Sequence, residues 1–446
     1  MKQVNGDEFL ELLYSNALGK KPCEVIIHKT LNIDLEKVNS EMIFLNNITF
    51  SGKKFNFTNK KKDCIKTFNF SGCTFNGDIS FEGTIHDIQF MSNTFDCDIF
   101  EIKNSEIGTL VFNTSYGSDS PKNTFKKGNL IVNNCNFSSP SYLAEVQFAP
   151  NSTFEINKCT FKNSISIDHL SFQEKLDLKI YNSTFKNKCT FNINFNAKDN
   201  KLNFRIDGCH FLESTYFENF HNALNSTLYI ANSNFMKYVD FEQFRINNLT
   251  IEKTIFSDNI SFQKSVYNAI KLDKVAFEKY AWFNDIKIEN YDRSTISTIK
   301  QHLINTHNQI DYLRFKSFEL IAYDKEKGKD CKDRIILFFN KHSNYFGLDW
   351  TRGLGFIGYT GFAFYLLFLI TYAIAMKNTI YFPKTVEDFC VGYLKFLNPI
   401  SLSQSPIKDA EEHIFPLLSF LIGRIFISYG IYQTIQAFRK FGVNGG

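Results

Sequence analysis

The sequence contains little of what marks several common classes of protein. In 446 residues tryptophan occurs twice and proline eight times, and the formal net charge is only +4. So small a net charge provides no strongly acidic or basic face, and no nucleic acid is expected as a partner. The sequence also has no phosphate-binding loop, nucleophile elbow, His-Glu-x-x-His or paired-cysteine motif. It therefore predicts neither an enzyme nor a cofactor.

A secretory signal is not expected either. Glu8 and Glu11 interrupt the apolar residues of the segment 1–18, which leaves no continuous apolar run. The ten cysteines would suit a disulfide framework only in a small secreted chain. This chain is not small, so we expect reduced thiols in a cytosolic domain.

Phenylalanine, by contrast, occurs 50 times and recurs at a fixed spacing. Each repeat has an apolar residue, a second one two positions later, an aromatic residue five positions after that, and a further aromatic or aliphatic residue six positions on. The aromatic residues at the third of these positions are Phe75, Phe137, Phe161, Phe185, Phe211, Phe235, Phe256 and Phe277. From Phe137 onward they are separated by steps of 24, 24, 26, 24, 21 and 21 residues. Steps of this length are typical of solenoids, in which one supersecondary unit stacks on the next.

The fold class predicted from this repeat is mostly β, with an N-terminal parallel β-helix solenoid. The alternating apolar residues within each copy favour short strands, and each repeated phenylalanine is expected to stack on its equivalent in the next coil. The segment 101–124 does not fit the repeat and is expected to hold a loop around Tyr116-Gly117-Ser118. A polar-faced cap is needed to protect the first coil, and residues 1–57 are assigned to it.

Small residues recur two positions before most of the repeated aromatic residues: Cys73, Cys135, Cys159, Ser183, Cys209, Ser233 and Thr254. A column of thiols could bind a metal ion, but serine and threonine interrupt this one and no histidine joins it in register. The pattern favours small side chains that fill a narrow slot in the core, and no metal site is predicted.

Beyond residue 290 the apolar period changes to that of helices. An amphipathic helix or helical hairpin is expected in 291–353. Residues 354–376 contain no charge and 414–438 contain only Arg424, and each stretch is long enough to cross a hydrocarbon core of about 30 Å. The sequence thus predicts a helical linker followed by two transmembrane α-helices. A short amphipathic surface helix is the alternative for the second.

Several residues of the predicted spans are candidates for pore lining or helix packing. Gly355, Gly358 and Gly361 remove side-chain bulk from one flank of the first span, which would permit close helix contact or merely a bend. Ser419 and Gly423 of the second span belong to the same candidate set.

Arg424 stands near the middle of the second predicted span. A guanidinium at that depth costs at least about 2.5–3.5 kcal/mol on insertion scales, so such groups usually face a bundle interior or water. Three interpretations stay open: a snorkelling or carbonyl-bonded arginine that fixes helix packing, a residue that lines or gates a pore, and one that lies at a shallower depth.

Residues that flank the spans predict their orientation. Trp350 and Arg352 precede the first span and Arg439 and Lys440 follow the second, and all four are expected to anchor the helices at the membrane interface. The connector 377–413 is slightly acidic. The positive-inside rule then places both termini and the β-helix in the cytoplasm.

The connector is too polar for a third span, but 386–402 favours a short re-entrant or interfacial helix. Its run Cys390-Val391-Gly392-Tyr393-Leu394 is faintly similar to a potassium selectivity filter. Leu394 stands where such a filter needs a second glycine, so we interpret the match as chance.

These features divide the chain into consecutive parts: an N-terminal cap (1–57), Phe-rich β-helix repeats (58–290), a helical bridge with a juxtamembrane segment (291–353), a first transmembrane helix (354–376), an extracytoplasmic connector (377–413), a second transmembrane helix (414–438) and a cytoplasmic tail (439–446).

Several short segments resemble bacterial membrane-anchored pentapeptide-repeat-like proteins: Phe318-Glu319-Leu320, Ser343-Asn344-Tyr345-Phe346-Gly347-Leu348, Asn398-Pro399-Ile400, and Tyr429-Gly430-Ile431-Tyr432-Gln433-Thr434-Ile435-Gln436-Ala437-Phe438-Arg439-Lys440-Phe441-Gly442. The resemblance implies a β-helix joined through a helical segment to a C-terminal pair of spans, with the ion-channel-like module that some relatives carry. The repeats depart from the strict five-residue pattern of that family, so a looser β-helix is expected.

Two functions are compatible with this organisation. In the first, the cytoplasmic β-helix senses a protein or small-molecule ligand, and paired spans form a homo-oligomer that conducts ions or perturbs the lipid bilayer, as effectors of bacterial defence do. In the second, the spans only anchor a non-conducting scaffold whose β-helix binds a partner. The sequence favours the first by a narrow margin because of Arg424 and the glycines.

Overall fold

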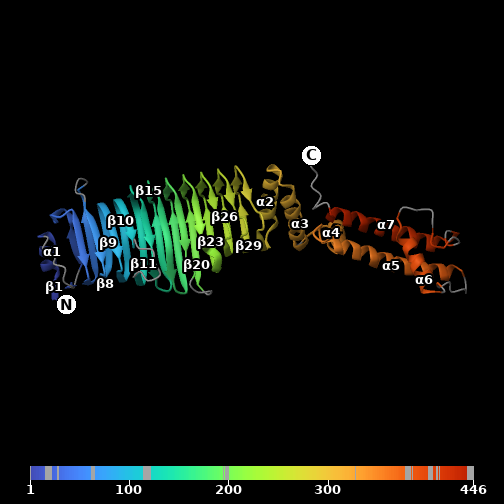
Figure 1. Cartoon of the computed structure of the whole chain (residues 1–446), viewed down its shortest axis with the longest axis horizontal. Helices are drawn as coiled ribbons and strands as arrows, with labels where there is room; N and C mark the ends of the chain where they lie inside the picture. The colour runs from blue at the N-terminus through green and yellow to red at the C-terminus, as the bar shows by residue number, and fades with distance from the viewer. Residues whose placement is uncertain are drawn as a thin grey trace. The chain divides into compact units, whose positions relative to one another are not determined.

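The structure is a computed structural model in which the chain forms two compact units, Met1–Thr298 and Ile299–Gly446 (Figure 1). The described residues are 2–15, 23–27, 30–61, 66–113, 122–193, 195, 200–326, 328–376, 383, 385–399, 405–407, 410 and 412–438. The predicted loop at Tyr116-Gly117-Ser118 and the predicted anchors Arg439 and Lys440 lie outside them.

The first unit is a parallel β-solenoid, which confirms the predicted fold class (Figure 1). Within the described residues, each strand pairs in parallel with its equivalent in the next coil, so that the strands form columns. The first column runs through β3 (Thr30–Asp34), β6 (Lys54–Asn59), β9 (Asp78–Met91), β10 (Thr94–Phe112), β11 (Asn123–Phe137), β14 (Ser152–Asn157), β17 (Lys175–Tyr181), β20 (Lys201–Asp207), β23 (Ala223–Ala231), β26 (Arg245–Glu252), β29 (Val266–Asp273) and β32 (Lys287–Tyr291).

The remaining columns complete each coil and share the long strands β9, β10 and β11. The second adds β15 (Thr160–Phe161), β18 (Thr184–Phe185), β21 (His210–Phe211), β24 (Asn234–Phe235), β27 (Ile255–Phe256) and β30 (Ala276–Phe277). The third adds β4 (Met42–Asn46), β7 (Thr67–Ser71), β12 (Ser141–Ala144), β16 (Ile165–Phe172), β19 (Cys189–Ile193), β22 (Thr215–Glu218), β25 (Val239–Asp240), β28 (Ile260–Ser261) and β31 (Ala281–Trp282). The fourth contains β1 (Lys2–Asn5), β2 (Cys23–Ile26), β5 (Ile48–Ser51), β8 (Thr74–Phe75) and β13 (Val146–Phe148).

Stacked phenylalanine rings fill the inside of the solenoid. From Phe137 to Phe277 the rings of the second column follow one another with centroids 4.5 to 5.7 Å apart. Phe75 does not belong to this stack, contrary to the alignment of the repeats. Its ring lies in the fourth column, 4.7 Å from that of Phe50 and 5.4 Å from that of Phe95. Both columns present an aromatic residue after an alternating strand, so the spacing alone does not distinguish them.

Asparagine turns the chain at a corner that precedes the second column. Asn104, Asn134, Asn182 and Asn232 occupy equivalent positions with φ between 47° and 53°, a conformation that asparagine tolerates better than most residues. Lys158, Lys253 and Lys274 adopt the same positive φ at this corner in other coils. Gly208 takes the same place with φ of 68°. The side-chain amide of Asn134 donates to Asn104 Oδ1 at 2.9 Å, which links neighbouring coils.

The stack of coils starts before residue 58. β2 already pairs with β5 and β3 with β6, so the segment 1–57 contributes coils as well as a cap. The cap itself is α1 (Gly6–Tyr14), whose Phe9 ring lies 5.7 Å from Phe50. Residues 101–112, expected to be irregular, continue strand β10. Short 3₁₀ turns occur at η1 (Leu35–Lys37) and η2 (Phe220–Asn222).

The helices that follow the solenoid begin after Asp292, whose Oδ1 accepts a hydrogen bond from Thr295 N at 2.7 Å. They are α2 (Arg293–Asn305), which crosses the division between the units, α3 (Gln309–Lys325), α4 (Cys331–Asn344), α5 (Trp350–Ala375), α6 (Val386–Leu397) and α7 (Ile414–Phe438). Asp349 Oδ1 caps α5 by accepting from Thr351 N at 3.0 Å, so this helix starts before the apolar stretch. α5 and α7 are long and apolar enough to cross a membrane.

Candidate functional site

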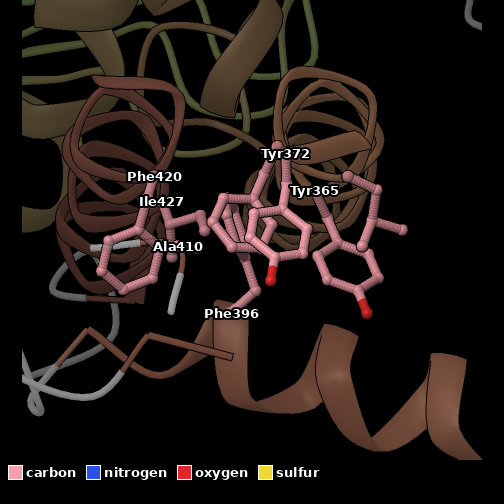
Figure 2. Close-up of a cluster of buried hydrophobic side chains, with 8 residues drawn as sticks. Tyr365, Tyr372, Phe396, Ala410, Phe420 and Ile427 are labelled. Carbon is pink, nitrogen blue, oxygen red and sulfur yellow. The ribbon is translucent and has the colours of Figure 1, made fainter. Parts of the chain in front are cut away.

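The two long apolar helices pack against each other and against α6. Figure 2 shows Phe396 of α6 directed toward side chains of both helices. Its ring lies 5.6 Å from Tyr365 of α5 and 5.6 Å from Phe420 of α7. The buried cluster consists of Tyr365, Phe368, Leu369, Tyr372, Phe396, Ala410, Phe420 and Ile427. Aromatic side chains from three helices thus hold this part of the chain together.

The faint match to a potassium filter lies in α6. The residues from Cys390 to Leu394 are helical, whereas a filter needs extended backbone whose carbonyls face the ion. Tyr393 instead donates its hydroxyl to Gly358 O at 2.8 Å, and Gly392 lies against the Tyr365 ring. The segment therefore serves helix packing in this structure.

The predicted span glycines divide into two kinds. A methyl group added at Gly361 would lie 2.4 Å from Leu397 of α6, and one added at Gly423 would lie 2.8 Å from Phe364 Cβ of α5. Gly355 and Gly358, in contrast, have no described neighbour within 4 Å of such a group. Only the first kind brings helices of this chain close together.

Two further glycines, not in the predicted set, make close contacts between α5 and α7. A methyl group at Gly353 would lie 2.3 Å from Thr434 Oγ1, and one at Gly430 would lie 2.7 Å from Ile357. Small residues allow this approach of two helices. Gly353 lies one residue before the predicted span 354–376.

Arg424 lies inside the helical unit. Its side chain is only 3% exposed, and its guanidinium carbon is 4.1 Å from the centroid of the Phe420 ring, one turn earlier on α7. The face of an aromatic ring attracts a cation, and the attraction strengthens where water is excluded. Ser419 is also buried and donates to Phe415 O at 3.0 Å. The arginine is therefore shielded by its own chain.

A cluster of polar side chains joins α4 to the second half of α7. The Asn344 amide donates to Gln433 Oε1 at 2.6 Å and to Gln433 O at 3.0 Å. Asn340 Oδ1 accepts from Tyr429 Oη at 3.0 Å and from Gln433 Nε2 at 3.3 Å. Asn344 and Gln433 are 1% and 4% exposed. We call these four residues the polar cluster.

Asn344 also closes the turn that leads into α5. Its Oδ1 accepts from Gly347 N at 2.9 Å. Tyr345 and Phe346 have positive φ of 51° and 60°, a costly conformation for such side chains that needs support from its surroundings. Ser317 of α3 adds support by donating to Phe346 O at 2.7 Å. The turn therefore connects α3, α4 and α7.

Asn344, Tyr429 and Gln433 belong to segments that the sequence marks as distinctive, but no pattern in the sequence predicts that these segments meet. The available signal was the presence of Tyr429 and Gln433 within a long apolar stretch, where amide and hydroxyl groups need partners. Their partners lie almost 90 residues away in the chain, with a separation of 89 between Asn344 and Gln433.

The predicted interface residues before the first span contact neighbouring aromatic groups. Trp350 is 38% exposed and stacks on Phe438 at 5.1 Å. The Arg352 guanidinium lies 4.5 Å from the Tyr345 ring, and its Nε is 3.3 Å from Asp349. Both residues thus lie at the end of the helical unit where α5 begins and α7 ends.

Half-buried aromatic side chains form a strip on the outer surface of the solenoid. The Tyr238 ring lies 6.1 Å from Tyr216 and 6.5 Å from Trp282, and Lys188 Nζ lies 4.5 Å above Tyr216. Burial, with the nearby Asp240 carboxylate, raises the pKa of Tyr238 to about 12, and burial also raises the pKa of Asp240. We call Tyr216, Tyr238 and Trp282 the aromatic strip. It offers flat apolar rings beside charged groups.

The column of small residues is a hydrogen-bonded ladder. Ser183 Oγ donates to Tyr181 O at 2.7 Å and accepts from Cys159 N at 3.1 Å, and Ser233 acts in the same way toward Cys209 N at 3.1 Å. At Cys73 an asparagine takes the place of the serine, because the Cys73 N–H donates to Asn93 Oδ1 at 2.9 Å. No group of metal-binding side chains occurs among the described residues. The small side chains of this column therefore fill the core of the solenoid.

Comparisons with known proteins add no relative: no family model, curated protein or solved structure matches this chain.

Proposed function

We propose that this chain is a membrane-anchored protein in which α5 and α7 cross the lipid bilayer. The observation that carries the proposal is the outward surface of these helices. Their most exposed large side chains are apolar, including Tyr359 at 82%, Ile374 at 72% and Ile425 at 67%. A helix buried in the core of a soluble protein would hide such residues, whereas here only 28% and 39% of the most apolar windows are buried.

The solenoid belongs on the cytoplasmic side in this proposal. Lys341 and Arg352 lie near the start of α5, and the positive-inside rule places such residues in the cytoplasm. Six cysteines of the solenoid, Cys73, Cys97, Cys135, Cys159, Cys189 and Cys209, are unpaired and buried, which suits a reducing compartment.

We infer that the helical unit is chiefly an anchor and that the solenoid binds a partner. Burial of Arg424 against Phe420 within one chain supports a packing role for the arginine and not a pore-lining one. The aromatic strip supports a binding role for the solenoid, because half-buried tyrosine and tryptophan side chains beside charged groups are typical of binding surfaces. This reverses the narrow preference drawn from the sequence.

A second candidate is a homo-oligomer that conducts ions or perturbs the bilayer. Gly355 and Gly358 favour it, because a methyl group added at either position would meet open space among the described residues. Small residues on a lipid-facing flank permit a helix of another copy to approach.

Ion flux from liposomes separates the two candidates. Purified full-length protein, its Arg424→Leu variant and its Gly358→Leu variant are reconstituted, and insertion is verified by protease protection. The anchored scaffold predicts tight liposomes in all three. Flux that requires Gly358 would contradict the scaffold and support the oligomer.

A further inference from the structure

Helix α4 carries an apolar surface that its own chain leaves open. Ile335, Ile336 and Phe338 are 53%, 58% and 55% exposed. Ile335, Phe338 and His342 are spaced by three and four residues, so they share one stripe of the helix. The Phe338 and His342 rings lie 4.2 Å apart along it. We call these three residues the outer stripe.

The opposite side of α4 is firmly attached to the helical unit. Leu337 on this side is 3% exposed. Phe339, four residues after Ile335, borders the stripe, and its ring lies 5.6 Å from Phe426 and 5.9 Å from Tyr429 of α7. Asn340 and Asn344 of the polar cluster are hydrogen-bonded to the same helix. Rotation of α4 cannot bury the outer stripe without breaking these contacts, so the stripe stays outward.

Basic residues flank the stripe on both sides. Arg334 and Lys341 are seven residues apart and therefore lie on one flank, and Lys332 lies on the other. Lys341 pairs with Asp324 at 3.0 Å. Lys332 and Arg334 are exposed and make no ion pair with any described residue. An apolar stripe between free cations is the arrangement of helices that lie in a membrane interface.

We propose that α4 lies on the cytoplasmic leaflet, with the outer stripe inserted at the acyl boundary and Lys332 and Arg334 bound to anionic lipid headgroups. The inference rests on the proposed membrane anchoring and adds a lipid preference to it. Two observations select an anionic bilayer as the occupant: the charge of the two free cations, and the continuity of α4 with the apolar helix α5 that follows it.

Quenching by brominated lipid tests the proposal on the full-length protein in nanodiscs. A single tryptophan is introduced by Phe338→Trp in a Trp282→Phe, Trp350→Phe background. Tyr359→Trp on α5 reports anchoring, and Tyr280→Trp on the solenoid is a control because Tyr280 is 56% exposed, close to the 55% of Phe338. Brominated lipid is supplied as the anionic or as the zwitterionic component at equal mole fraction.

The proposal predicts quenching at positions 338 and 359 but not at 280. At 338 the anionic brominated lipid should quench more strongly, because each cation enriches such lipids about fivefold at about 1 kcal/mol per charge. Lys332→Gln with Arg334→Gln should remove this preference while quenching at 359 is unchanged.

Other outcomes have distinct meanings. Quenching at 359 without quenching at 338 would overturn the α4 proposal alone, as expected if a second copy or another protein covered the stripe. Equal quenching at 338 by both lipids would overturn the anionic preference. Absence of quenching at both positions would overturn the membrane anchoring itself.

Discussion

The solenoid and the helical unit use the same apolar residues in opposite ways. In the solenoid, phenylalanine is stacked inside, as in the Phe185–Phe211 pair with centroids 4.6 Å apart, and polar side chains such as Asn134 lie at the corners. In the helical unit, apolar residues such as Ile425 face outward and the amides of Asn344 and Gln433 are buried. The difference supports the proposed membrane anchoring, with water around the first unit and lipid around the second.

The substitution with the largest expected effect on stability replaces a phenylalanine inside the solenoid, and it is compared with a phenylalanine exposed on α7. Phe185→Ala removes a ring from the stack and should cost about 3–5 kcal/mol of stability through lost burial and a cavity. Phe415→Ala, at a residue 69% exposed on α7, should cost less than about 1 kcal/mol in detergent. Hydrogen exchange of β17 to β21 and of α7 measures both effects. Equal losses of stability in the solenoid and in the helical unit would contradict this difference between them.

Buried amides are the reverse case. Gln433→Leu should destabilise the helical unit by about 1–3 kcal/mol, because it removes the side-chain hydrogen bonds that Gln433 makes with Asn340 and Asn344. Gln436→Leu is the matched control, since Gln436 is exposed one turn later on the same helix. Thermal unfolding in detergent compares them. A Gln433→Leu variant as stable as the control would show that the polar cluster does not hold α4 to α7.

Substitutions at two glycines compare the face of α5 that packs against α7 with its open face. Gly353→Ala should cost about 1–3 kcal/mol because Thr434 must move. Gly358→Ala meets no neighbour and should stabilise the helix by up to about 1 kcal/mol. Thermal unfolding measures stability, and light scattering of the detergent complex measures association. A loss of self-association in Gly358→Ala would instead favour the oligomer.

The smallest effect concerns pH. Burial lowers the pKa of His302 in α2, so the folded protein binds fewer protons there than the unfolded chain. Stability contributed by the neutral form is therefore present above the unfolded pKa of about 6.5 and falls as the pH drops below it. The protection of amides 299–305, taken as the exchange rate relative to the intrinsic rate at each pH, should decrease as the pH is lowered from about 7.5 to about 5.5. His302→Gln should reduce that dependence, and an unchanged dependence would contradict the assignment to His302.

Periodicity predicted the solenoid well because a stacked coil repeats the same local solvent environment. It could not assign Phe75 to a column, because two columns share the aromatic spacing. It also missed strand β10, since the longer step between β10 and β11 interrupts the repeat. The coils already start at β2, where Val25 pairs with Phe50. The alignment of the repeats did not include these two residues, so it did not predict this start.

Composition predicted the two apolar helices, but not their contacts. Gly355 and Gly358 were grouped with Gly361 by spacing, while only the last meets another helix in this chain. The pairing of Asn344 with Gln433 depends on how α4 folds back along α7, which no local pattern encodes. Tertiary contacts over such separations arise from packing and not from sequence period.

Two natural cysteines allow the most direct test of membrane crossing. Cys331 at the start of α4 and Cys390 on α6 are exposed, while the other described cysteines are buried. Intact cells and inverted vesicles are labelled with a membrane-impermeant maleimide, and Cys331→Ser and Cys390→Ser variants assign the signals. The account predicts labelling of Cys390 from outside and of Cys331 from the cytoplasm. Labelling of both cysteines from the same side would contradict it.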